Sequence, residues 1–208
     1  KNIAELLDSD YKLDSLYATN DWIHDHLDRN AMQVNSKELA QISNLKSPDD
    51  VLAIVKMKNN VRVSKYGLTL VLDDVRDPGN LGTIIRMCDW FGVSSIVCSV
   101  NTVDKYNPKV VQSSMGSIFR VPVYYTDLVD YLKDIETPIY GACIDGEDVK
   151  NHSFIKDFHL VMGNEANGIS GAVLDLLSNN ITIKNVGGKA ESLNVAIATS
   201  ILLHEICC

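Results

Sequence analysis

Gly-Lys-Ala-Glu-Ser-Leu-Asn-Val-Ala, residues 188–196, places two polar residues, Ser192 and Asn194, at the entrance to a long apolar segment. The segment that follows, residues 195–203, is apolar on nearly every face, which predicts a buried helix. A glycine-rich turn with a hydroxyl and an amide at a helix N-terminus brings backbone N–H groups and side chains together around a ligand. We therefore expect a ligand-facing turn that leads into a helix in the interior of the fold.

The chain upstream of this turn alternates between short apolar runs and helical stretches. The whole chain has 208 residues, of which 46% are hydrophobic, and this is enough for one domain of ordinary size and a smaller one. Buried apolar strands that alternate with helices predict an α/β fold, with a mostly parallel sheet and helices on both faces. The predicted strands are 68–72, 95–98, 121–124, 139–143, 160–162 and 181–183, and the predicted helices are 81–90, 108–118, 128–135, 172–177 and 191–206.

Residues 1–60 are predicted to form a separate, small α/β domain. Lys1 lies inside a predicted helix and is not an initiator Met, so we expect an opening strand to precede it. Residues 61–67 are predicted to be a linker, and residues 68–208 the main domain. The patterns of the small domain predict helices over 2–7 and 21–27 and from Ser36, and strands over 13–18, 32–34 and 51–55.

The distribution of charge leaves two interpretations open. The net charge of −8 opposes general affinity for nucleic acids, because phosphate contacts come mainly from Lys and Arg. One basic stretch nevertheless has no acidic residue between Val51 and Lys65, and it comprises Lys56, Lys58, Arg62 and Lys65. A solvated linker and an RNA-contacting patch both explain this pattern.

A polar cluster follows the predicted strand 68–72, where the ligands of parallel sheets bind. It reads Asp-Asp-Val-Arg-Asp-Pro-Gly-Asn-Leu-Gly-Thr-Ile-Ile-Arg, residues 73–86. Pro78 and Gly79 predict a tight turn and Asn80 a helix cap. The apolar stripe of the following helix should be buried, so Arg86 should point away from the core. A turn and a cap therefore explain the first three residues but not Arg86.

A second cluster follows the predicted strand 160–162 and reads Gly-Asn-Glu-Ala-Asn-Gly-Ile-Ser, residues 163–170. Gly163 at the strand end would let a ligand approach the backbone, and the carboxylate of Glu165 should lie just outside the sheet. Taken alone, this cluster is better explained as an acidic turn before a helix, because Gly-Asn-Glu is a weak signal.

The three clusters together closely resemble the motifs of the SpoU/TrmH family of RNA ribose methyltransferases, within the SPOUT superfamily. The resemblance is strong over residues 66–208, whereas residues 1–60 are similar only in pattern to the family's ribosomal-protein-like substrate-binding domain. The matching motifs are Asp77-Pro78-x-Asn80-x-Gly82-x-Ile84-x-Arg86, Gly163-Asn164-Glu165-x-x-Gly168-Ile169-Ser170 and Glu191-Ser192-Leu193-Asn194-Val195-Ala196.

The resemblance implies transfer of a methyl group from S-adenosylmethionine to a ribose 2′-hydroxyl of RNA. Ribosomal RNA is favoured over transfer RNA because of the appended N-terminal domain, with transfer RNA as the alternative. A deep C-terminal trefoil knot is also implied, whereas periodicity alone predicts an ordinary doubly wound sheet, because threaded chains are nearly absent among folds. The family further implies a homodimer formed through the knotted domain.

Site residues are carried over only where this sequence matches the family motifs. The implied catalytic residues are Asn80, Arg86, Glu165, Ser192 and Asn194. The implied cofactor-binding residues are Cys143, Gly163, Asn164, Ile183, Ser192 and Leu193. The candidate RNA-binding residues are Lys56, Lys58, Arg62, Lys65, Arg76 and Arg120. The sequence departs from the family over residues 184–190, where the turn is one residue longer and lacks the usual proline.

Arg86 matches the residue that has been assigned the role of general base in the family. A guanidinium is effectively always protonated, so it is a poor proton acceptor. We therefore hypothesise that Arg86 mainly holds an RNA phosphate and polarises the hydroxyl, with deprotonation assisted by a neighbour.

Other classes of protein fit the sequence less well. A nicotinamide-dependent oxidoreductase should show a G-x-G-x-x-G turn after its first strand, and residues 77–82 do not. A non-catalytic RNA-binding or assembly protein on the same fold remains an alternative. The five cysteines are odd in number and have no C-x-x-C spacing, so we expect neither a disulfide framework nor a metal site. No segment reaches the roughly 18 apolar residues of a membrane span, and we expect a soluble, cytoplasmic protein.

Overall fold

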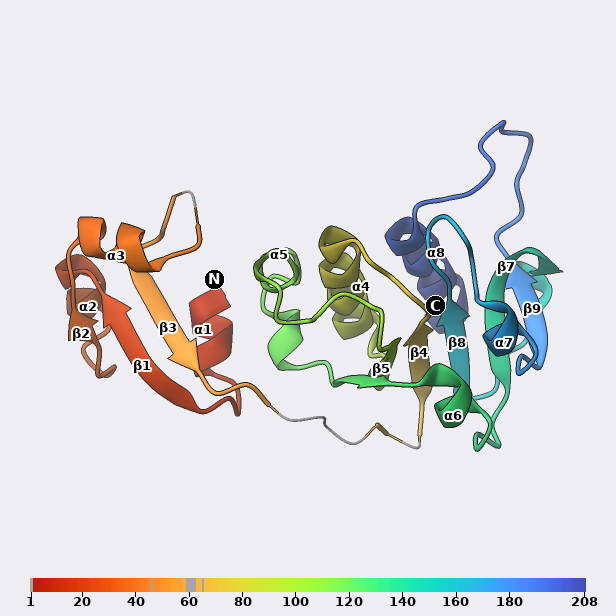
Figure 1. The fold of residues 1–208 in the computed structure, drawn as a ribbon, viewed down its shortest axis with the longest axis horizontal. Helices are drawn as coiled ribbons and strands as arrows, with labels where there is room; N and C mark the ends of the chain where they lie inside the picture. The colour runs from red at the N-terminus through yellow and green to blue at the C-terminus, as the bar shows by residue number, and fades with distance from the viewer. Residues whose placement is uncertain (1, 46, 59–62, 65) are drawn as a thin grey trace. The chain divides into compact units, whose positions relative to one another are not determined.

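The computed structural model describes residues 2–45, 47–58, 63–64 and 66–208. The chain forms two compact units, Lys1–Asn59 and Asn60–Cys208, which we describe separately (Figure 1). The predicted linker, residues 61–67, falls partly outside the described residues, and so do the candidate RNA-binding residues Arg62 and Lys65.

The N-terminal unit is a three-stranded sheet with order β2-β1-β3, in which β1 runs parallel to β2 and antiparallel to β3. Its small core contains Leu6, Leu16 and Leu39. The third helix begins at Ser36, as predicted, and the residue before it, Asn35, is its N-cap and forms a capping box with Glu38. The elements are α1 (Asn2–Leu7), β1 (Leu13–Ala18), α2 (Asn20–Asp25), β2 (Met32–Gln33), α3 (Ser36–Ile42) and β3 (Val51–Val55).

The C-terminal unit is built on a six-stranded sheet with order β6-β5-β4-β8-β7-β9. All of its strand pairs are parallel, which confirms the predicted class of fold. The strands are β4 (Leu68–Leu72), β5 (Ser95–Ser99), β6 (Val123–Thr126), β7 (Ile139–Asp148), β8 (Phe158–Met162) and β9 (Asn179–Thr182). The helices are α4 (Pro78–Phe91), α5 (Pro108–Ser113), α6 (Leu128–Leu132), α7 (Gly171–Leu174) and α8 (Val195–Cys207), with short 3₁₀ turns at Ser117–Phe119 and Val149–Asn151.

Helices cover both faces of this sheet. Successive side chains of a strand point to opposite faces, so one strand contributes residues to two apolar clusters. Leu70 and Leu72 of β4 belong to one apolar cluster, whereas Val71 between them belongs to the other. The first cluster includes buried residues of α4, α5 and α8, and the second includes buried residues of α6 and α7. Burial on both faces explains why these strands appear in the sequence as continuous apolar runs.

The first helix of this unit starts earlier than residue 81, where the pattern predicted it. Asp77 is its N-cap, since the Asp77 Oδ1 atom accepts a hydrogen bond from the backbone N–H of Asn80 at 2.8 Å. The prediction that Asn80 caps α4 was therefore wrong, and its side chain is left for other contacts. The predicted buried stripe is confirmed, because Leu81, Ile84, Ile85 and Cys88 have no exposed surface.

Two other helices end or begin where local chemistry requires it. The predicted helix 108–118 stops at Ser113, because Met115 and Gly116 adopt positive φ angles of 54° and 97° that a right-handed helix excludes. The predicted helix 191–206 begins only at Val195, with Asn194 as its N-cap. α8 packs against α4 and is buried on one side, but Ile197 on another face is 52% exposed.

His159 of β8 predicts a specific dependence of stability on pH. Its side chain is 7% exposed and hydrogen-bonded to the hydroxyls of Tyr131 at 2.9 Å and Thr137 at 3.1 Å. Burial lowers the pKa of His159 from 6.5 to about 4. The unfolded chain therefore takes up this proton at a higher pH than the folded chain, and stability is lost as the pH falls from about 6.5 towards 4.

Urea unfolding measured at pH 7 and pH 4.5 checks this expectation. We expect the parent to lose about 2 kcal/mol more than a His159→Gln variant between these two pH values, because the variant lacks the titrating group. All other titrating groups are shared and cancel in the comparison. Equal losses in the two proteins would show that the imidazole is not held neutral by the fold.

Within the described parts of the chain, no helix has the length and apolar character needed to cross a membrane.

Candidate functional site

The three polar clusters predicted from the sequence meet at the carboxyl ends of neighbouring strands. β4 and β8 pair directly, so the loops that follow them lie side by side. The side chain of Asn164, in the loop after β8, donates from Nδ2 to the backbone oxygen of Asp74, in the loop after β4, at 2.8 Å. Asp74 has a φ of 62°, an uncommon value for a residue other than glycine that often marks functional loops.

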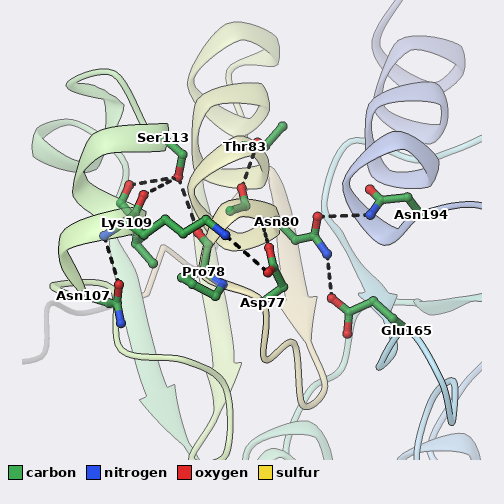
Figure 2. A network of polar contacts seen from close by, with 11 residues as sticks. Asp77, Pro78, Asn80, Thr83, Asn107, Lys109, Ser113, Glu165 and Asn194 are labelled. Carbon is green, nitrogen blue, oxygen red and sulfur yellow. Dashed lines mark hydrogen bonds and ion pairs between the residues drawn. The ribbon is translucent and has the colours of Figure 1, made fainter. Parts of the chain in front are cut away.

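A chain of side-chain hydrogen bonds joins all three clusters through Asn80 (Figure 2). The Nδ2 atom of Asn80 donates to Glu165 Oε1 at 2.8 Å, and its Oδ1 atom accepts from Asn194 Nδ2 at 3.1 Å. These contacts link α4, the loop after β8 and the first turn of α8. The residues that they join are 85 and 114 positions apart in the sequence.

The direction of donation along this chain follows from the backbone. Asn194 Oδ1 accepts from the backbone N–H groups of Ala196 at 3.0 Å and Ile197 at 3.2 Å, so this atom must be the oxygen. Its nitrogen must then face Asn80, which fixes the oxygen of Asn80 there and turns the Asn80 nitrogen towards Glu165. Both ends of the Asn80 amide are thus occupied, and its orientation is determined by the helix N-terminus of α8.

The side chains of Arg86 and Ser192 differ from this network, because both are exposed and neither makes a hydrogen bond or ion pair with the residues that the structure describes. Arg86 lies on α4 and points away from the core, as the sequence predicted. A guanidinium without a protein partner offers five donors to an incoming group. The arrangement therefore combines a fixed carboxylate and amides with the available guanidinium of Arg86.

Gly163 is required by the protein itself. A Cβ atom at this position would lie 2.2 Å from the carbonyl carbon of Gly168 and 2.3 Å from the nitrogen of Ile169. The reason is a tight hairpin in which Asn164 and Gly168 exchange two backbone hydrogen bonds of 2.9 Å. The sequence-based explanation, that a glycine here admits a ligand, is therefore not needed to account for the residue.

Asn164 acts as the scaffold of the same hairpin. In addition to the bond to Asp74, its Oδ1 atom accepts from the backbone N–H groups of Ala166 at 3.0 Å and Asn167 at 3.1 Å. Its side-chain oxygen and its backbone polar groups are all used within the protein. These bonds fix the loop that carries Glu165, and they leave one N–H of the Asn164 amide for a further contact.

Three of the candidate cofactor-binding residues share an apolar character that suits an adenine ring. Cys143 lies in the middle of β7 and Ile183 directly follows the adjacent strand β9; both are half-buried, and Leu193 is 48% exposed. Residues 143–146 bulge from the ladder between these strands, because Ala142 and Glu147 both pair with Ile181. Burial, with a smaller contribution from Asp145, raises the pKa of the Cys143 thiol and keeps it neutral at pH 7. This set fits the apolar part of S-adenosylmethionine.

The longer turn between β9 and α8 has its own internal support. Asn185 Oδ1 accepts from the backbone N–H groups of Gly187 at 2.9 Å and Gly188 at 2.8 Å. Its Nδ2 atom donates to the backbone oxygen of Gly188 at 3.1 Å. Residues 185–188 therefore form an Asn185-centred turn before the chain reaches Ser192.

The described candidate RNA-binding residues are not equally available. Lys56 is exposed, but Lys58 pairs with Asp10 in the N-terminal unit. Arg76 binds Asp74 at 2.8 Å, and Arg120 forms a two-pronged contact with Asp89. Burial raises the pKa of Asp89, but the hydrogen bonds from Arg120 and Ser117 outweigh it and the net shift is downward. No group of three or more His, Cys, Asp or Glu side chains within the described ranges is arranged to hold a metal ion.

Lys109 was missed by the sequence reasoning, although it lies in the same network (Figure 2). Its Nζ atom is 3.6 Å from Asp77 Oδ2, beside the first turn of α4. The signal that would have found it is the Asn-Pro helix start at residues 107–108, which follows the end of a buried strand.

Comparison with known proteins places this arrangement in a family. The model of the SpoU rRNA Methylase family matches residues 67–204, a range that contains all three clusters. The chain belongs to the SpoU rRNA methylase family. The resemblance expected from the SpoU motifs is thereby confirmed.

Several SpoU relatives are similar over most of this chain. The 23S rRNA (guanosine(2553)-2′-O)-methyltransferase RlmP of Bacillus subtilis is 31% identical over 169 residues, covering 79% of this chain and 67% of that protein. A TrmH-family structure from Porphyromonas gingivalis has a TM-score of 0.90 and 34% identity, covering 99% of this chain and 86% of that one. The SpoU methyltransferase AviRb of Streptomyces viridochromogenes, solved with AdoMet, has a TM-score of 0.83 and 26% identity, covering 98% and 85%.

Proposed function

We propose that this protein is an S-adenosylmethionine-dependent RNA methyltransferase that methylates a ribose 2′-hydroxyl, with ribosomal RNA as its substrate. The observation that carries the proposal is the meeting of three SpoU motifs at one point, where Asn80, Glu165 and Asn194 are bonded together. Arg86 of the first motif remains available to a substrate. The names of RlmP and AviRb, a 23S rRNA methyltransferase and an AdoMet-bound SpoU methyltransferase, support the substrate and the cofactor.

The proposed chemistry requires few protein groups. S-adenosylmethionine supplies a methyl group that is bonded to a sulfonium sulfur, and this sulfur is already a good leaving group. The protein must align the 2′-oxygen for in-line attack and help to remove its proton. Arg86 holds the adjoining RNA phosphate and polarises the hydroxyl, because its fork can bind both oxygens of a phosphate. The 2′-oxygen forms its bond to the methyl carbon as the bond from that carbon to sulfur breaks, and a neighbouring group other than Arg86 accepts the hydroxyl proton. Glu165 and Asn194 keep Asn80 in one orientation beside the reacting ribose.

The cofactor would be held between the carboxyl ends of β7, β8 and β9. Cys143, Ile183 and Leu193 would contact the adenine, and the backbone near Gly163 and Ser192 would contact the rest. Residues 184–194 would close the site by threading the chain as a trefoil knot. The course of the chain supports this, because it returns from the edge strand β9 to α8, which packs against α4. An experimental structure with S-adenosylmethionine in which these residues make no contact would contradict this placement.

Methyl transfer with labelled S-adenosylmethionine tests the proposed function. We expect label to enter unmodified 23S ribosomal RNA transcripts and to be recovered as 2′-O-methylated nucleosides by mass spectrometry. Transfer RNA transcripts are the matched control substrate, and label in these alone would favour the transfer-RNA alternative. Titration of the protein with S-adenosylmethionine by calorimetry separates an enzyme from a binding module, because absence of heat at high cofactor concentration would contradict the proposal.

We also propose a homodimer formed through the C-terminal unit. Trp90 on α4 is 82% exposed and Ile197 on α8 is 52% exposed, and the two helices pack against one another. Exposed large apolar side chains on adjoining helices favour a self-complementary interface. Sedimentation velocity of the whole chain distinguishes a dimer from a monomer.

The N-terminal unit is the proposed RNA-selecting domain, and its exposed Lys56 is the described member of the basic stretch available for this role. A cytoplasmic location is part of this proposal, and cell fractionation tests it.

A further inference from the structure

Lys109 lies at the edge of the candidate site in a position that its neighbours fix. Asn107 accepts the backbone N–H of Lys109 at 2.9 Å and starts α5 there. Ser113, one turn further along α5, donates to the backbone oxygen of Lys109 at 2.7 Å and approaches the Pro78 oxygen at 3.4 Å. α5 is thus attached to the first turn of α4.

Glycines of α4 allow this close approach. A Cβ atom at Gly82 would lie 1.9 Å from Ser113 Oγ and 2.7 Å from the Val110 backbone oxygen, so the two helices touch at this point. A Cβ atom at Gly79 would lie 3.3 Å from Lys109 Cε, so the lysine stem extends over the first turn of α4. The lysine stem therefore directs the ammonium group to the N-terminal end of α4.

The protein partner of this ammonium group holds it weakly. The Lys109 side chain is 62% exposed, and its Nζ atom is 3.6 Å from Asp77 Oδ2, beyond ordinary hydrogen-bond length. Asp77 uses its other oxygen to cap α4. Exposed pairs of this kind contribute little, so a stronger anion can take the lysine from Asp77.

Lys109 and Arg86 stand at the two ends of one stripe of α4. Residues 79, 83 and 86 are spaced i, i+4 and i+7 and share a helix face. Lys109 covers the first of them, and Arg86 is the last. Seven residues of helix span about 10 Å, so an RNA strand that lies along α4 can place different phosphates at Arg86 and at Lys109.

We propose that Lys109 binds a backbone phosphate of the substrate RNA, a few nucleotides from the phosphate that Arg86 holds. The inference rests on the proposed function and adds to it a second, sequence-independent contact that orients the RNA strand along α4. Lys109 pairs with Asp77 in the absence of RNA, and the RNA phosphate replaces Asp77 as its partner when RNA binds. Lys109 is a positioning residue and takes no part in the transfer of the methyl group.

The salt dependence of RNA binding tests this contact. Because phosphate contacts are independent of sequence, a short fluorescein-labelled single-stranded RNA of mixed sequence is a sufficient probe, with binding followed by anisotropy between 50 and 200 mM salt. Removal of one contact lowers the magnitude of the slope of log K against log salt by about 0.7. We therefore expect Lys109→Met, which keeps the apolar stem, to show a slope smaller in magnitude by about 0.7 and to bind the RNA about five-fold more weakly at 0.1 M salt.

Three comparisons make the result specific. Lys109→Arg keeps the charge and should keep the parent slope. Lys133→Met is the matched control, since Lys133 is an exposed lysine at the end of α6, before the amino end of β7, and pairs with Asp130 at 2.6 Å. Calorimetry should give the same affinity for S-adenosylmethionine in the parent and in all three variants.

An unchanged slope in Lys109→Met, or an equal loss in Lys133→Met, overturns the contact while leaving the proposed function intact. A parent protein that binds no RNA and transfers no methyl group overturns both together.

Discussion

Arg86→Lys lowers kcat for RNA methylation by about 100-fold in our expectation, the loss typical of removing one preorganised donor at a reacting centre. The lysine keeps the charge but loses the planar fork that binds two oxygens at once. Arg86 has no partner among the described residues, so the substitution disturbs no contact within them. Steady-state rates with saturating RNA and cofactor measure the effect.

The control for this prediction makes the same exchange of side chains outside the three motifs. Arg29, in the N-terminal unit, pairs with Asp28 at 3.0 Å, and Arg29→Lys should change kcat by less than about two-fold. The affinity of Arg86→Lys for S-adenosylmethionine should match that of the parent. Near-parental activity of Arg86→Lys would show that the fork is dispensable and that Arg86 acts only as a charge.

Gly163→Ala is expected to destabilise the C-terminal unit by about 3 kcal/mol or more. The added methyl group meets backbone atoms of Gly168 and Ile169, which a change of side-chain rotamer cannot move away. The hairpin must open, and Glu165 then leaves Asn80. Scanning calorimetry should show a fall in Tm of about 6 °C or more for a unit of this size.

Gly171 provides a matched control for the same change. A Cβ atom there meets nothing within 4 Å, and the residue begins α7. Gly171→Ala should therefore leave Tm unchanged or raise it slightly, because alanine restricts the unfolded chain. If Gly163→Ala has the same Tm as Gly171→Ala and the parent, the hairpin does not impose the constraint that the structure indicates.

The sequence predicted those parts of the fold that depend on apolar periodicity. Leu81, Ile84, Ile85 and Cys88 recur at helical spacing, and all four are fully buried. Strand ends and polar clusters gave the position of the site, because parallel strands deliver their carboxyl ends to one edge. The recognition of the family added the chemistry.

Features that depend on side-chain competition were not predictable from the pattern. Asn80 has the side chain of a helix cap, but Asp77 three residues earlier takes that role and frees Asn80 for Glu165. Lys109 comes near Asp77 only because Gly79 and Gly82 let α5 approach α4. Neither outcome is visible without the distance between the two helices.

The hydrogen bonds of Asn80 have a consequence for folding. Their partners lie 85 and 114 residues away in the sequence, so each bond closes a long loop at an entropic cost that earlier contacts must offset. Contacts of such long range form late as a chain folds. A partly folded molecule would have strands and helices but no oriented Asn80, and methylation activity would therefore report the completion of folding more sensitively than secondary structure does.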